Sequence, residues 1–120
     1  MVGASANATR PSNGVLRFLV EKGYRVFPVN PGYVGQTIIG QPVLARLADT
    51  PEPIDIVDIF RRPEFVGPII DEALRLDPLP RVIWMQLGIR DDAAAARAEA
   101  AGLTVIMNRC LKIEYSRLMK

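Results

Sequence analysis

Residues 54–76, IDIVDIFRRPEFVGPIIDEALRL, hold the pattern that decides the fold. The run over 54–60 is rich in isoleucine and valine, which is typical of a buried strand. Pro63 then stands where a helix accepts proline, at its first position, and Glu64 suits the positive end of the helix dipole. We therefore expect a strand over 54–60 and a helix over 63–76, the start of a parallel crossover unit.

The same alternation extends outward in both directions along the chain. The further elements that it predicts are helices over 12–22 and 91–102 and strands over 25–29, 81–85 and 103–107. Residues 33–53 are the least regular, with one short helical turn at 44–47, and the segment after 110 is expected to be helical. This order predicts an α/β fold in one domain over 1–120, a Rossmann-like parallel sheet of about five strands with helices on both faces. Only Met1 and Val2 precede Gly3, so the first strand is expected to be truncated at the N-terminus.

Composition excludes several classes of function. The 15 basic and 13 acidic residues give a net charge of +2 and are scattered, which argues against a nucleic-acid partner. No apolar stretch approaches the roughly 20 residues of a membrane span, and no signal peptide is visible. The single cysteine, Cys110, excludes an internal disulfide. We expect a cytoplasmic protein with no membrane partner.

The chain contains no histidine. This absence removes Ser-His-Asp and Cys-His catalysis and most zinc sites. We therefore expect no metal site and no catalysis that depends on histidine.

A loop of small residues, Gly3-Ala4-Ser5-Ala6-Asn7-Ala8, precedes the first predicted helix. Gly3, Ser5 and Ala8 stand where a dinucleotide fingerprint has glycines or alanine. Small side chains let a ligand approach the main chain, and the free N–H groups at a helix start attract anions. The loop is therefore a candidate phosphate site.

The other predicted strands end in residues that are small, polar or cationic, and none of these strand ends is a carboxylate. An NAD site places an acid at the end of the second strand, where this sequence has Asn30 and Pro31. Arg61 and Arg62 follow the next strand and suit a phosphate, although one of them could simply pair with a nearby acid. The predicted ligand is an adenine nucleotide with several phosphates.

Several separated motifs together carry a resemblance to a known group of proteins. They are Gly3-Ala4-Ser5, Arg10-Pro11-Ser12, Val29-Asn30-Pro31, Asp58-Ile59-Phe60-Arg61-Arg62-Pro63, Trp84-Met85-Gln86-Leu87-Gly88 and Asn108-Arg109-Cys110-Leu111-Lys112-Ile113-Glu114. In this order they resemble the stand-alone CoA-binding proteins, which are similar to the CoA-binding domain of the succinyl-CoA synthetase alpha subunit. The resemblance covers nearly the whole chain.

The resemblance implies a non-catalytic protein that binds CoA or an acyl-CoA. The residues that it places at the ligand are Gly3, Ala4, Ser5, Arg10 and Ser12 around the diphosphate, Asn30, Pro31, Phe60 and Arg61 around the adenosine, and Gln86 and Gly88 along the pantetheine. Cys110 is either an inert buried thiol or the partner of CoA in a mixed disulfide. The protein partners left open are a second copy of the chain or another protein.

Two other functions stay open at this point. One is a small NAD(P)-dependent oxidoreductase, which the missing acid at Asn30 disfavours. The other is an interaction domain that keeps the fold without the ligand.

Overall fold

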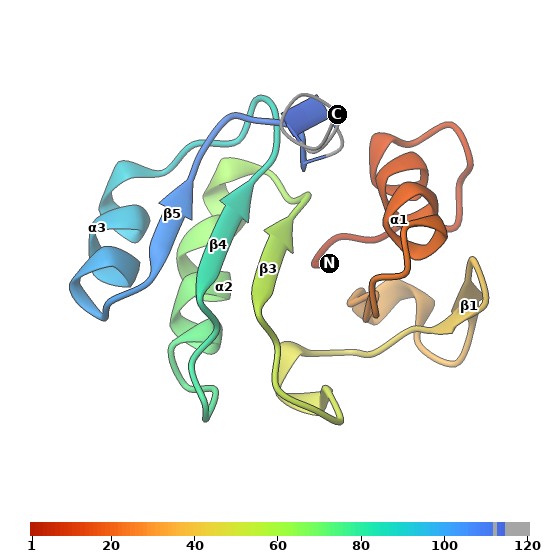
Figure 1. Ribbon diagram of the computed structural model, residues 1–120, viewed down its shortest axis with the longest axis horizontal. Helices are drawn as coiled ribbons and strands as arrows, with labels where there is room; N and C mark the ends of the chain where they lie inside the picture. Colours follow the sequence, from red (N-terminus) through yellow and green to blue (C-terminus); the bar gives the residue numbers. More distant parts are fainter. Residues whose placement is uncertain (112, 115–120) are drawn as a thin grey trace.

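The computed structural model describes residues 1–111 and 113–114. Its centre is a parallel sheet of three strands in the order β3-β4-β5 (Figure 1), and their bounds are β3 Ile56–Ile59, β4 Val82–Met85 and β5 Thr104–Ile106. The α/β class with a parallel sheet is confirmed, although the strands are fewer than expected. Each of these three strands lies inside one of the predicted runs.

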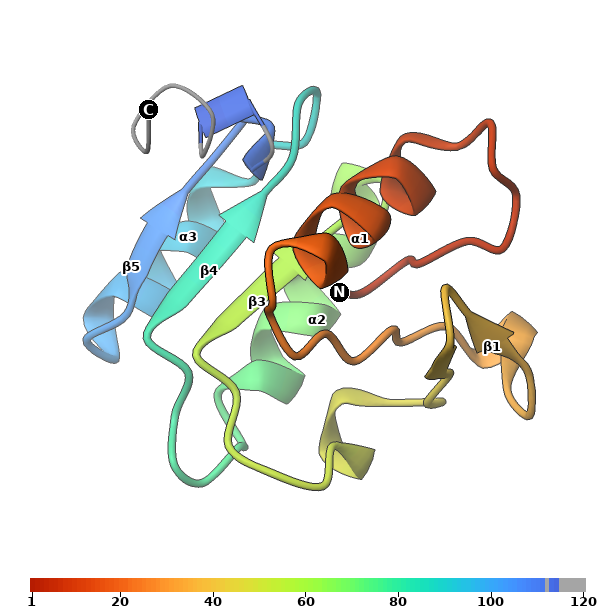
Figure 2. The same cartoon turned by 45° about the vertical axis from the view of Figure 1, so that its right-hand side comes forward.

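Helices cover both faces of the sheet, as predicted (Figure 2). The bounds are α1 Pro11–Glu21 on one face and α2 Val66–Ala73 and α3 Asp92–Ala100 on the other. The helix predicted over 63–76 is divided, because residues 63–65 form the 3-10 turn η3 (Pro63–Phe65) before α2 starts. Of the helix predicted after 110, residues 111, 113 and 114 are helical, and 112 and 115–120 lie outside the described residues.

Two apolar clusters fill the space between the sheet and its helices. The first joins the inward-facing residues of β3 and β4, such as Val57 and Ile83, to α2 and α3. Ala94 and Ala98 of α3 are fully buried, because their small side chains let the helix lie close to the sheet. The second cluster joins α1 to the start of the chain, with Leu16 fully buried.

The prediction of a strand over 25–29 is wrong in extent. Only Val29 pairs, through isolated parallel bridges to Val2 on one side and Leu44 on the other. Pro28 has no N–H to donate to a ladder. Val2 also bridges Ile59, so Val2 lies between Val29 and the end of β3.

The irregular region predicted over 33–53 contains structure that the sequence analysis missed. A small antiparallel hairpin forms from β1 (Thr37–Ile38) and β2 (Gln41–Pro42), and a 3-10 turn, η1 (Pro31–Tyr33), precedes it. The helical turn expected at 44–47 lies three residues later as η2 (Leu47–Asp49).

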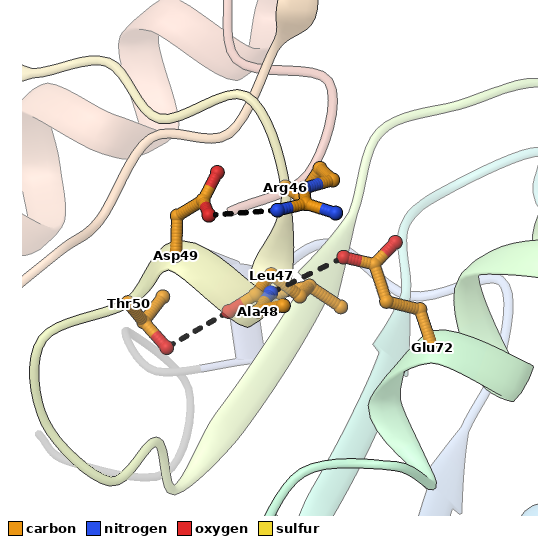
Figure 3. Close-up of polar contacts among 6 residues, drawn as sticks. All are labelled: Arg46, Leu47, Ala48, Asp49, Thr50 and Glu72. Carbon is orange, nitrogen blue, oxygen red and sulfur yellow. Dashed lines mark hydrogen bonds and ion pairs between the residues drawn. The ribbon is translucent and has the colours of Figure 1, made fainter.

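One polar contact attaches η2 to α2, and others lie within residues 46–50, as Figure 3 shows. The Ala48 N–H donates to the Glu72 carboxylate at 3.3 Å, and the Thr50 hydroxyl donates to the Leu47 carbonyl at 2.9 Å. Among the described residues, no helix is long and apolar enough to cross a membrane.

Candidate functional site

A cavity of about 600 Å³ lies at the carboxyl ends of the strands, beside the start of α1. This edge of a parallel sheet is where ligands bind in such folds. Most of the expected ligand-binding residues line it, namely Gly3, Ser5, Arg10, Ser12, Asn30, Phe60, Arg61 and Gln86. The other lining residues are Asn7, Pro11, Val15, Tyr33, Leu87, Ile89 and Cys110.

Gly3 is required where the chain enters the cavity wall. Its N–H donates to the Val29 carbonyl at 2.9 Å, which attaches its backbone to the segment that ends at Val29. A Cβ at this position would lie 2.5 Å from the Phe60 carbonyl oxygen, and φ is +88°. Only glycine combines that positive φ with such a close approach.

The loop after Gly3 is held by its own side chains. The Ser5 hydroxyl accepts a hydrogen bond from the Asn7 N–H at 3.1 Å, and the Asn7 side chain accepts two from Thr9. The Asn13 side-chain amide, buried in α1, donates to the Ser5 carbonyl at 2.9 Å. These contacts fix the loop relative to the helix whose first turn it faces.

The start of α1 is open toward the cavity. Arg10 is the N-cap residue of α1, and its side chain makes no capping hydrogen bond to the described residues. Pro11 follows it as the first helical residue. Both Arg10 and Pro11 line the cavity, as does Ser12. The N-terminal N–H groups and the positive end of the helix dipole therefore favour an anion here, together with the Arg10 charge.

Asn30 locks the loop to the end of the neighbouring segment. Its side-chain amide donates to the Ala4 carbonyl at 2.8 Å, and its side-chain oxygen accepts from the Gly32 N–H at 2.9 Å. Ala4 is fully buried and does not line the cavity, and its place at the diphosphate stays a prediction. Pro31 also does not line it, because it begins η1 and turns away after Asn30.

The two arginines that follow β3 diverge. Arg61 lines the cavity, and its guanidinium stacks over the Phe65 ring at 4.4 Å from the ring centre. Arg62 is exposed and lies 3.9 Å from the Glu64 carboxylate, so it is the member of the pair that meets a nearby acid. Only Arg61 of this pair is placed to meet a ligand in the cavity.

Gln86 forms a buried wall of the cavity and separates it from the Asp58 carboxylate. The Gln86 side-chain amide donates to Asp58 at 2.6 Å, and its oxygen accepts from the Leu111 N–H at 3.4 Å. Burial raises the pKa of the Asp58 carboxyl to about 6 from an ordinary 3.8, while the Gln86 hydrogen bond and the Met1 amino group lower it. The second carboxylate oxygen has no hydrogen-bond partner among the described residues.

Gly88, predicted along the pantetheine route, does not line the cavity. Its N–H donates to the Asn108 side chain at 2.7 Å, which holds the turn that carries its neighbours, Leu87 and Ile89, and its place along the pantetheine stays a prediction. Leu87, Ile89 and Tyr33 were not predicted as ligand-binding residues, because their positions depend on the paths of loops. Cys110 is half-buried and lines the cavity, and its mixed disulfide with CoA stays a prediction.

No group of three or more acidic or cysteine side chains in the described part of the chain could hold a metal ion. The site is therefore built from backbone N–H groups, arginines and neutral side chains. Such a set of donors suits a phosphorylated organic ligand.

The chain is similar in sequence and fold to several known proteins. The chain is 33% identical to YneT of Bacillus subtilis, an uncharacterised protein, over 116 residues that span 97% of this chain and 83% of YneT. A solved structure from Thermus thermophilus is 41% identical with a TM-score of 0.92, and the match covers 98% of this chain and 87% of that one. A hypothetical protein from Pyrococcus horikoshii is 34% identical with a TM-score of 0.92, covering 99% and 81%.

The sequence pattern of one family matches nearly the whole chain. Residues 1–116 match the family described as CoA binding domain, which includes both the glycine loop and the segment that follows β5. The chain therefore belongs to the CoA binding domain family.

Proposed function

We propose that the protein binds CoA or an acyl-CoA in the 600 Å³ cavity and acts as a binding module rather than as an enzyme. The observation that supports this proposal most directly is the charge of the residues that line the cavity. Its charged residues are Arg10 and Arg61, and none of the lining residues is a carboxylate. A polyanion with an adenine group and a long uncharged arm matches such a wall.

The parts of CoA have natural places in this cavity. The diphosphate would lie against the Gly3 backbone and the open first turn of α1, near Arg10 and Ser12. The adenosine would lie between Asn30 and Arg61, and the pantetheine would follow Gln86 toward Cys110. Each of these residues lines the same cavity, which supports one continuous ligand site.

A binding role is also favoured by the chemistry of the wall. Apart from the two arginines, the lining residues that can ionise are Tyr33 and Cys110. Asp58 is buried behind Gln86, and its hydrogen bond to that residue keeps it from direct contact with a ligand. No lining pair combines a base with a nucleophile, as acyl transfer requires.

NADP is the second ligand to consider, because Arg61 suits a phosphate on the ribose and Asn30 would not repel it. Calorimetric titration with CoA, acetyl-CoA, NAD and NADP separates these cases. We expect binding of CoA or acetyl-CoA alone. Binding of NADP alone would support the oxidoreductase, and no binding of any of the four would leave an interaction domain.

A pair of arginine variants tests the placement of the ligand. Arg10→Ala removes a cation from the cavity wall, whereas Arg17→Ala removes one from an exposed position of α1 outside the lining. A charged hydrogen bond contributes about 1.5 to 3 kcal/mol, so Arg10→Ala should weaken CoA binding by roughly 10- to 100-fold. Arg17→Ala should have little effect. Equal affinities of the two variants for CoA would contradict the placement.

A further inference from the structure

Arg61, one of the two arginines on the cavity wall, has a side chain that is held at two points. Its stem crosses Gly3, since a Cβ built at that glycine would lie 3.0 Å from the Arg61 Cδ. Its guanidinium lies over the Phe65 ring, 4.4 Å from the ring centre. The absence of a side chain at Gly3 therefore makes room for the stem of Arg61, and the Phe65 ring supports the charged group.

The position of Phe65 follows from the turn after β3. Residues 63–65 form η3, and the Phe65 N–H donates to the Arg62 carbonyl at 2.9 Å. This tight turn brings residue 65 back beside residue 61. Phe65 is 41% exposed, does not line the cavity, and is not part of either apolar cluster of the described chain. The ring therefore contacts Arg61 rather than the core.

The Arg61 guanidinium is left unpaired among the described residues. In that part of the chain Arg61 forms no ion pair, whereas its neighbour Arg62 lies 3.9 Å from Glu64. A guanidinium that stacks on a ring keeps its N–H donors free, because they lie in its own plane. Such a plane can donate two parallel hydrogen bonds to one phosphate. An oriented, unpaired cation on a cavity wall favours an anionic group of the ligand.

Which phosphate Arg61 meets follows from the rest of the wall, given the CoA binding proposed above, on which this inference rests. CoA carries a diphosphate in its middle and a separate phosphate on the ribose of its adenosine. The diphosphate has donors at the open first turn of α1 and at Arg10. Among the lining residues, the cation that remains for the adenosine end is Arg61. The ribose phosphate is therefore the group that matches it.

We propose that Phe65 is a positioning residue that holds the Arg61 guanidinium against the ribose phosphate of CoA. The stacked pair then makes the protein prefer CoA to dephospho-CoA, the same molecule without that phosphate. Phe65 does not touch the ligand and acts by restricting the rotamers of Arg61. Because a free arginine side chain loses much conformational entropy when it is ordered, an arginine that is already ordered binds a phosphate more tightly.

Calorimetric titrations with CoA and with dephospho-CoA, at one ionic strength, measure the preference as the ratio of the two dissociation constants. Arg61→Ala removes the cation, and Phe65→Leu and Phe65→Met each remove the ring. Phe65→Tyr keeps an aromatic ring under Arg61. Arg62→Ala is the matched control, because it removes an adjacent arginine that does not line the cavity. Circular dichroism checks that each variant is folded.

We expect the parent chain to bind CoA about 10- to 100-fold more tightly than dephospho-CoA, as a charged hydrogen bond to the extra phosphate allows. Arg61→Ala should abolish this preference by weakening the binding of CoA alone. Phe65→Leu and Phe65→Met should lower the preference by at least about threefold, and Phe65→Tyr should retain it. Arg62→Ala should leave it within about twofold of the parent value.

The outcomes separate this inference from the function on which it rests. Full preference for CoA in the two variants without the ring overturns the positioning role of Phe65. Equal weakening of both ligands by Arg61→Ala overturns the assignment of the phosphate, because Arg61 then meets the diphosphate that the two ligands share. A parent chain that binds both ligands equally overturns the inference but not the proposed function. A parent chain that binds neither overturns the proposed function itself.

Discussion

Gly3 offers the sharpest test of how the CoA site is built. Gly3 has φ +88° and Gly23, at the end of α1, has φ +89°, so alanine is strained to the same degree at both. They differ in surroundings: a Cβ at Gly3 would meet the Phe60 carbonyl oxygen at 2.5 Å, while a Cβ at Gly23 meets nothing within 4 Å. Comparing alanine variants at the two positions therefore separates the effect of backbone conformation on stability from the effect of the close approach to Phe60.

The expected magnitudes follow from these contacts. Alanine at positive φ lowers the free energy of unfolding by about 1 kcal/mol, which is all that Gly23→Ala should lose. Gly3→Ala adds a contact with backbone that cannot rotate away, and overpacking of this kind costs about 1 to 3 kcal/mol more. At roughly 4 °C per kcal/mol for a domain of this size, the thermal midpoint of Gly3→Ala should be about 4 to 12 °C lower than that of Gly23→Ala.

Thermal unfolding followed by circular dichroism measures this difference, and titration with CoA accompanies it. Because the added Cβ pushes the loop away from Phe60, Gly3→Ala should also bind CoA more weakly, while Gly23→Ala should bind like the parent chain. Equal midpoints for the two variants would refute the close approach. Undiminished CoA affinity of a folded Gly3→Ala protein would refute the role of the loop.

Two further predictions concern carboxylates. Asp91 caps α3 by accepting a hydrogen bond from the Ala94 N–H at 3.0 Å, so Asp91→Ala should lower the free energy of unfolding by about 1 kcal/mol. Asp92→Ala loses only an exposed ion pair and should lower it by less. Equal losses for the two variants in urea unfolding would contradict the cap. Asp58 has a folded-state pKa of about 6, above its ordinary 3.8, so its ionised form lowers stability above pH 6, and this penalty disappears as the pH falls toward 4. Asp58→Asn removes this penalty, so its free energy of unfolding should exceed that of the parent by more at pH 7 than at pH 4. The difference between the two proteins should shrink by up to about 3 kcal/mol as the pH is lowered from 7 to 4. A difference that stays constant over this range would argue against the raised pKa.

The elements that could be predicted from the sequence are those in which two independent signals agree. In α3, acids precede the helix and Gly102 follows it, and the helix forms over Asp92–Ala100 with Asp91 as its cap. The strands β3, β4 and β5 combine an apolar run with a turn at the end. The location of the cavity follows from the same pattern, since the carboxyl ends of parallel strands lie along one edge.

What could not be predicted depends on neighbours. Residues 25–29 have the composition of a strand, yet only Val29 forms bridges, to Val2 on one side and to Leu44 on the other. The hairpin of β1 and β2 turns through Ile39 at φ +50° and Gly40 at φ +75°. A β-branched residue rarely adopts positive φ, so Ile39 gives no hint of the turn. In the site, Tyr33 and Leu87 reach the cavity through loop paths that no local signal specifies.

The placement of charge links the fold to the proposed ligand. Asp58 belongs to β3, two residues before Phe60, which lines the cavity, and a carboxylate facing a polyphosphate there would oppose binding. Gln86 prevents this contact: its amide donates to Asp58 on one side while the residue lines the cavity on the other. A neutral side chain thus stands between the buried acid and the ligand, and the charges that remain on the wall are those of Arg10 and Arg61. Replacing Gln86 with leucine would keep the volume but leave Asp58 without its donor, so the loss should appear in stability as well as in CoA affinity.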